Sequence, residues 1–301
     1  MAYRSILVHV SDAGAGAPSG APSGASASTA DPQVDAAIAL ARDMQAHLTG
    51  MAASGISRTL FPTLPDEQED PTLALHLGFV REQGRAALAR FSDQCTRAVL
   101  PSWEARLVDD EAAAGLSLHA RAADVTVLSQ QDPAAATPDN LAADVIMQCG
   151  GPVLLLPHAP LASAPVFPCR HALVAWDASR EAARALQGAL PLLVRAHQVT
   201  VALIDTLPSN HASLDARAAD PLPMLARHGV QAQRVVRTLD APLLPHRRHP
   251  VGDTLLALCA ELQADLLVMG AYAHSRWRET LLGGVTRTIL ERMNLPVLMV
   301  H

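Results

Sequence analysis

Glycines and hydrogen-bond donors follow the strand expected at 265–269, in the run GAYAHSRWRETLLGGVTRTIL. Gly270 comes directly after that strand, where the lack of a side chain lets backbone approach a ligand closely. Gly283 and Gly284 come directly before an expected helix, whose first amides can donate to an anion. Further donors near this loop come from Ser275, Arg276, Arg278 and Thr286. The spacing therefore predicts a site for a phosphate-bearing ligand.

The cations of this chain limit the chemistry. The sequence has no lysine, so all 23 of its Lys/Arg residues are arginine. This excludes a P-loop lysine, a kinase-type lysine and a Schiff-base lysine. There is also no Gly-x-Ser-x-Gly motif and no convincing acid–base pair. We therefore predict no catalytic residues, and any nucleotide hydrolysis would be slow.

Two other groups of reactive side chains have plainer interpretations. The run at 246–249, His-Arg-Arg-His, is interpreted as a solvated loop rather than an anion-binding patch or a metal site. The cysteines are spread along the chain without a Cys-x-x-Cys pair, which is typical of buried thiols in a reducing compartment. They are Cys95, Cys149, Cys169 and Cys259.

Strand and helix patterns alternate along the chain, which predicts parallel sheets covered on both faces. Expected strands lie near 5–10, 47–53, 103–108, 124–129, 152–156, 171–176, 198–204, 231–238, 265–269 and 296–300. Expected helices lie near 32–46, 71–99, 111–122, 140–148, 179–195, 213–228, 251–262 and 285–293. Ligands bind such sheets beyond the carboxyl ends of the strands, where the strand order reverses.

The chain also repeats itself. AADVTVLSQ at 122–130 matches QADLLVMGA at 263–271, and GPVLLLPH at 151–158 matches LPVLMVH at 295–301. These repeats predict two domains, at 1–158 and 171–301, joined by a proline-rich linker. The Gly/Ala/Ser/Pro tract at 13–30 is interpreted as a solvated insertion rather than a dinucleotide loop. The helix after it is expected to begin only at Asp31 and Pro32.

The second copy resembles the universal stress protein family. The resemblance is carried by the family pattern Gly-x2-Gly-x9-Gly followed by Ser or Thr, by VAWDASREAARAL at 174–186 and by the closing PVLMV. The matching positions are Gly270, Ala273, Gly283 and Gly284, followed by Val285 and Thr286. The first half resembles a degenerate member, so the chain is similar to a tandem member of the family.

The resemblance implies two tandem flavodoxin-like (Rossmann-like) α/β domains, each a five-stranded parallel sheet with helices on both faces. It also implies ATP or a related adenine nucleotide, with Mg²⁺, bound in the second domain. Asp177 corresponds to the acidic residue that holds the nucleoside. The fifth strands of the two domains are expected to pair within the chain, and a further homodimer is left open.

Departures from the family pattern leave a second function open. Ala273 replaces a glycine and Gly284 replaces the Ser/Thr hydroxyl. In the first copy the corresponding loop has no glycine, and Pro133 and Pro138 remove amide donors. We therefore expect no nucleotide in the first half. The alternative for the whole chain is a scaffold or interaction protein with both sites degenerate.

Composition agrees with a packed protein that acts on neither nucleic acid nor membrane. Of the 301 residues, 50% are hydrophobic, and the formal net charge of −6 argues against a nucleic-acid-coating role. There is no apolar run of about 18 residues that could span a bilayer. The apolar stretch at the amino terminus is too short for a signal peptide, so we expect a cytoplasmic protein.

Overall fold

The computed structural model describes residues 2–11, 31–55, 71–132, 140–158, 167–205, 220–239, 250–272 and 284–301. The predicted insertion at 13–30 and the cluster at 246–249 lie outside these residues. Within them, strands and helices alternate through both halves of the chain, as predicted. The proposed domain limits, 1–158 and 171–301, stay a prediction.

The first half contains β1 (Ser5–His9), α1 (Pro32–Met44), β2 (His47–Ala53), α2 (Pro71–Arg97), β3 (Trp103–Val108), α3 (Ala112–Ala120), β4 (Val125–Ser129), α4 (Leu141–Cys149) and β5 (Val153–Leu156). The second half contains β6 (His171–Ala175), α5 (Arg180–Leu193), β7 (Gln198–Asp205), α7 (Leu222–Arg227), β8 (Ala232–Thr238), α8 (Pro250–Glu261), β9 (Leu266–Gly270), α9 (Gly284–Arg292) and β10 (Val297–Val300).

The described strands form one ten-stranded sheet in the order β3-β2-β1-β4-β5-β10-β9-β6-β7-β8. Strands are parallel within each half, and the two halves meet where β5 pairs antiparallel with β10, with Leu298 opposite Leu154. Each half has the order 3-2-1-4-5 found in Rossmann sheets. The predicted pairing of the two fifth strands within one chain is confirmed, and it covers an edge of each half-sheet.

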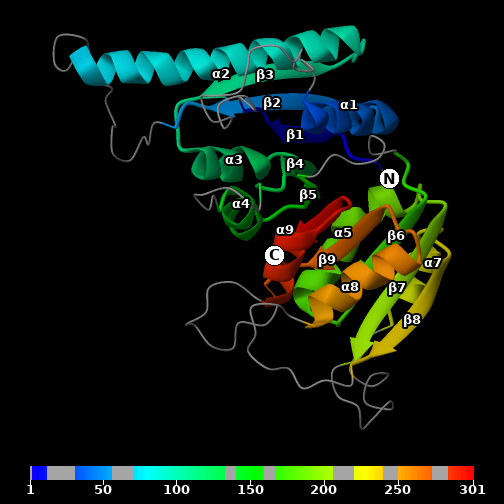
Figure 1. The fold of residues 1–301 in the computed structure, drawn as a ribbon. Helices are drawn as coiled ribbons and strands as arrows, with labels where there is room; N and C mark the ends of the chain where they lie inside the picture. Colours follow the sequence, from blue (N-terminus) through cyan, green and yellow to red (C-terminus); the bar gives the residue numbers. More distant parts are fainter. Residues whose placement is uncertain are drawn as a thin grey trace, which may run out of the picture.

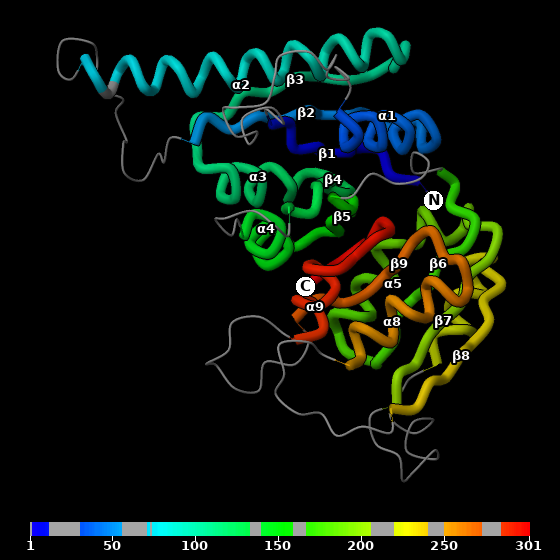
Figure 2. Tube along the Cα trace, in the orientation of Figure 1, coloured from blue at the N-terminus to red at the C-terminus, as the bar shows by residue number. Residues whose placement is uncertain are grey.

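Helices cover both faces of the sheet, as expected for parallel strands that are apolar on both sides. One face packs against α1, α2, α5 and α7, and the other packs against α3, α4, α8 and α9. Figures 1 and 2 show the two halves side by side, meeting near β5 and the carboxy terminus. The core is built mainly from Ala, Val, Leu and Ile.

Local signals in the sequence account for the starts of the main helices. Asp31 caps α1 by accepting a hydrogen bond from the Gln33 amide at 2.9 Å, and Pro32 occupies the first turn. Ser179 caps α5, its hydroxyl oxygen accepting from the Ala182 amide at 3.1 Å. The predicted start of the first helix is confirmed, and the bounds of the other elements agree within two residues, with one exception.

The exception is the helix predicted at 213–228. The first part of this predicted helix, residues 213–219, lies outside the described part of the chain, and α7 begins only at Leu222. Asp220 and Pro221 precede the helix, and the Asp220 carboxylate accepts from the Leu222 amide at 3.0 Å. Because Pro221 and Pro223 lack amide hydrogens, they suit a helix start and not a helix interior. Of the described residues in the predicted helix, Asp220, Pro221 and His228 are therefore not helical.

Candidate functional site

The strand order of the second half reverses between β6 and β9. These strands pair in parallel through Ala172–Val174 and Leu266–Val268, so their carboxyl ends lie side by side. The loop containing Asp177 follows β6, and Gly270 ends β9. The structure therefore brings two of the predicted site residues to the edge where ligands bind in α/β sheets.

Asp177 lies in an exposed turn between β6 and α5. Its Oδ1 accepts a hydrogen bond from the Ser179 amide at 2.9 Å, and Ala178 between them has a φ of +61°. This turn holds the carboxylate beside the first turn of α5, where the helix dipole favours negative charge. The carboxylate is accessible to an incoming ligand.

Gly270 has a packing role that its position in the sequence does not predict. A Cβ atom at this residue would lie 2.6 Å from the Ala182 nitrogen and 2.7 Å from the Glu181 carbonyl carbon. The missing side chain therefore makes room for the backbone of α5. The sequence-based interpretation, in which this glycine also lets backbone approach a ligand, stays a prediction.

A hydrogen bond joins the start of α9 to the residues that follow β9. Thr286 is 2% exposed, and its Oγ1 accepts a hydrogen bond from the Tyr272 amide at 3.0 Å. The Thr286 hydroxyl thus supports the start of α9 from inside the protein, and its contact with a ligand stays a prediction. Gly284 at the first position of α9 is exposed and Val285 is half-buried, whereas Ala273 and Gly283 lie outside the described residues.

Tyr272 is a residue that the sequence motif does not single out. Its φ of +59° is uncommon for a bulky residue, and its side chain is 7% exposed. The ring lies edge-on to His301 with a centroid distance of 6.1 Å. Burial, with a contribution from the Asp144 carboxylate of α4, raises the pKa of Tyr272 to about 12. The Tyr272 side chain is therefore buried against the end of the chain at His301.

The reversal point of the first half is bridged by Gln33, which the sequence analysis did not identify. Its Nε2 donates to the carbonyl oxygens of His9 at 2.9 Å and Val127 at 3.1 Å. Its Oε1 accepts from the Ser129 hydroxyl at 2.6 Å. The side chain thus ties the ends of β1 and β4 together. Glu181 holds the matching position in α5, where an ionised carboxylate has no hydrogen to donate to carbonyl oxygens.

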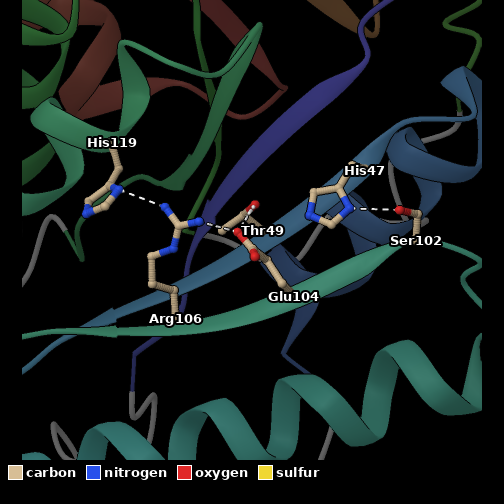
Figure 3. A network of polar contacts seen from close by, with 6 residues as sticks. All are labelled: His47, Thr49, Ser102, Glu104, Arg106 and His119. Carbon is tan, nitrogen blue, oxygen red and sulfur yellow. Dashed lines mark hydrogen bonds and ion pairs between the residues drawn. The ribbon is translucent and has the colours of Figure 1, made fainter.

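A separate polar network lies on β2, β3 and α3 (Figure 3). Its members are His47, Thr49, Ser102, Glu104, Arg106 and His119. Arg106 contacts Glu104 and lies 2.9 Å from Nδ1 of His119, and Thr49 donates to Glu104 at 3.2 Å. The described residues contain no group of three His, Cys, Asp or Glu side chains arranged for a metal ion. We interpret the network as support for the outer strand.

This network predicts a pH effect on stability. Burial and the Arg106 guanidinium lower the pKa of His119, while Glu104 opposes them. The unfolded chain therefore binds the proton more readily, so the stabilisation is present above the ordinary histidine pKa and is lost as the pH falls through the folded value. We expect wild-type protein to lose more thermal stability than His119→Gln between about pH 7 and about pH 5. Melting curves at both pH values measure this, and equal losses would contradict it.

The four cysteines are buried and unpaired, as predicted. Burial raises the pKa of Cys95, Cys169 and Cys259 to about 12, and it raises the pKa of Cys149 as well. Thiols with raised pKa values are poor nucleophiles near neutral pH.

Among the described helices, none is long and apolar enough to cross a bilayer.

Comparisons with known proteins agree with this architecture. The model of the universal stress protein family matches residues 168–301. This half of the chain belongs to the universal stress protein family. A universal stress protein from Archaeoglobus fulgidus has a similar structure, with a TM-score of 0.67, 12% identity and coverage of 98% of this chain and 96% of that one. A search of curated proteins finds no match to the chain.

The fold similarity extends to the first half. The structure of a Pseudomonas aeruginosa protein named for the same family is similar to this chain, with a TM-score of 0.59 and 15% identity. The match covers 99% of this chain and 93% of that one. Because both structural matches span nearly the whole chain, the tandem arrangement of universal stress protein folds is confirmed at the level of the fold.

Proposed function

We propose that the chain is a nucleotide-binding universal stress protein that holds ATP or a related adenine nucleotide, with Mg²⁺, in its second half. The observation that carries this proposal is the meeting of three elements at one edge of the sheet. The Asp177 turn follows β6, Gly270 ends β9, and the 3.0 Å bond between Tyr272 and Thr286 places the start of α9 beside them.

Each accessible element has a role in the proposed site. The carboxylate of Asp177 would accept hydrogen bonds from the nucleoside. The first amides of α9, from Gly284 onward, have no acceptor within the helix and would donate to phosphate oxygens. Bound Mg²⁺ would neutralise part of the triphosphate charge, chiefly through phosphate oxygens and water. With no lysine in the chain, these groups suit binding better than turnover.

The proposal predicts that ATP binding depends on the Asp177 carboxylate. Asp177→Asn keeps an oxygen that can accept from the Ser179 amide but removes the charge. A hydrogen bond to a charged group contributes about 1.5–3 kcal/mol, so we expect ATP·Mg²⁺ affinity to fall by about tenfold or more. Calorimetric titration of the full chain measures both dissociation constants.

The control is Asp220→Asn. The Asp220 carboxylate is exposed and accepts from an amide two residues later, as the Asp177 carboxylate does, but it precedes α7. This variant should bind ATP as the wild type does. If the wild type binds no nucleotide at about millimolar ATP and Mg²⁺, the scaffold function with both sites degenerate replaces the proposal.

A further inference from the structure

The side chain of Gln130 reaches from the first half of the chain into the second. Gln130 follows β4, is 6% exposed, and donates from Nε2 to the carbonyl oxygen of Leu290 at 2.7 Å. Its Oε1 accepts a hydrogen bond from the His158 amide at 3.0 Å. Both ends of the buried amide are therefore hydrogen-bonded. The nitrogen donates to a carbonyl of the second half, and the oxygen accepts from an amide of the first half.

Leu290 lies in the last turn of α9, where carbonyl groups have no donor partner within the helix. Gln130 supplies a donor to one of these carbonyls. At the other end of the same helix, Thr286 is bonded to the Tyr272 amide. The helix is thus held at its start by the second half and near its end by the first.

The other helix that begins at the candidate site is held in a similar way. The Tyr3 hydroxyl donates to the carbonyl oxygen of Gly188 in α5 at 2.6 Å. Arg195, just beyond α5, forms a two-bond ion pair with Asp43 of α1 at 2.6 and 3.0 Å. Both helices whose first turns face the candidate site are therefore positioned by contacts with the first half.

We infer that Gln130 is a positioning residue for the ligand site of the second half, although it lies in the half that lacks the glycine motif. This inference rests on the proposed nucleotide function. Leu290 is six residues from Gly284, about 9 Å along a rigid helix, so a shift at one end moves the amides at the other. The first half then sets the geometry of an anion site to which it contributes no direct contact.

The test replaces Gln130 with glutamate, which has the same length. Glutamate keeps an oxygen for the His158 amide but faces the Leu290 carbonyl with an acceptor, and a negative charge near the end of a helix is unfavourable. We expect the ATP·Mg²⁺ dissociation constant to rise by about fivefold or more, as for the loss of one useful hydrogen bond. Gln130→Met, which removes the donor without adding charge, should change affinity in the same direction if the glutamate variant does not fold.

The matched control is Gln33→Glu. Gln33 is also buried and donates to backbone carbonyls, but its partners are within the first half. This variant should lose stability while its ATP affinity stays within about twofold of the wild type. Equal effects of the two substitutions on affinity, or no effect of Gln130→Glu, would overturn the inference.

Amide hydrogen exchange without ligand separates this inference from the proposed function. The amides of Thr288 and Ile289 lie in α9 between its two attachments. They should exchange faster in Gln130→Glu than in Gln33→Glu when the two variants are compared at equal global stability. If the wild type binds no ATP, the proposed function fails, but unchanged exchange in α9 is what overturns the positioning role.

Discussion

Replacing Gly270 with alanine is expected to lower the free energy of unfolding by about 3 kcal/mol, near the upper end of the cost of overpacking. The added Cβ would lie 2.6 Å from the Ala182 nitrogen and 2.7 Å from the Glu181 carbonyl carbon. Both are backbone atoms, so no side-chain rotation relieves the contact, and α5 must move away from β9. Thermal and denaturant unfolding of the two proteins measure the loss.

Gly78→Ala provides the matched control for this substitution. Gly78 lies within α2, and a Cβ there would meet no atom within 4 Å. Alanine in an exposed helix stabilises by about 0.5–1 kcal/mol relative to glycine, so this variant should melt slightly higher than the wild type. If Gly270→Ala were as stable as the wild type, this result would contradict the close packing of α5 against β9 at Gly270.

The same substitution also tests how packing and binding are joined at this edge. The residues that collide with the new Cβ belong to the first turn of α5, and Asp177 lies in the turn just before it. Displacing α5 moves that turn relative to β9. We therefore expect Gly270→Ala to weaken ATP binding as well, by more than its effect on the folded fraction alone explains.

The strands and helices were predictable because the signals that set them are local. Apolar runs with β-branched residues define the strands, and capping residues such as Asp31 and Ser179 define where helices begin. The pairing of β5 with β10 was different in kind. It came from the family resemblance, and the register that places Leu298 opposite Leu154 required the structure.

The candidate site was predictable in position and less so in detail. Spacing places Asp177 and Gly270 after strands that are neighbours in the sheet. Spacing does not say what surrounds a residue, so the close packing of α5 against Gly270 required the structure. Likewise, the hydrogen bond from the Tyr272 amide to the Thr286 hydroxyl oxygen required the structure.

The residues that sequence reasoning missed act through contacts across long stretches of chain. Gln33 joins the carbonyls of His9 and Val127, and Gln130 reaches Leu290 across the junction of the halves. Neither glutamine belongs to a motif. A glutamine directly after a predicted helix start is a weak signal, because most glutamines at such positions are solvated. Their importance follows only from burial together with backbone carbonyls that lie within reach.

The second large effect is expected at the junction of the two half-sheets. Leu154 in β5 is 1% exposed and lies opposite Leu298 of β10, which is fully buried. Leu154→Asp removes apolar contacts with a cost of about 2–5 kcal/mol and places an unpaired carboxylate where no cation is opposite it, which adds several kcal/mol more. The sum is comparable to the whole stability of a typical domain.

We therefore expect Leu154→Asp to lack a cooperative melting transition or to expose the edges of β5 and β10 and associate. Circular dichroism melts and size-exclusion chromatography measure the two outcomes. Leu75→Asp is the control, since Leu75 in α2 is 78% exposed and the same substitution should change stability little. A Leu154→Asp protein that keeps the elution volume of the wild type and melts near the wild-type temperature would mean that β5 and β10 do not pair. The halves would then be separate sheets, and the route by which Gln130 reaches α9 would be lost with the junction.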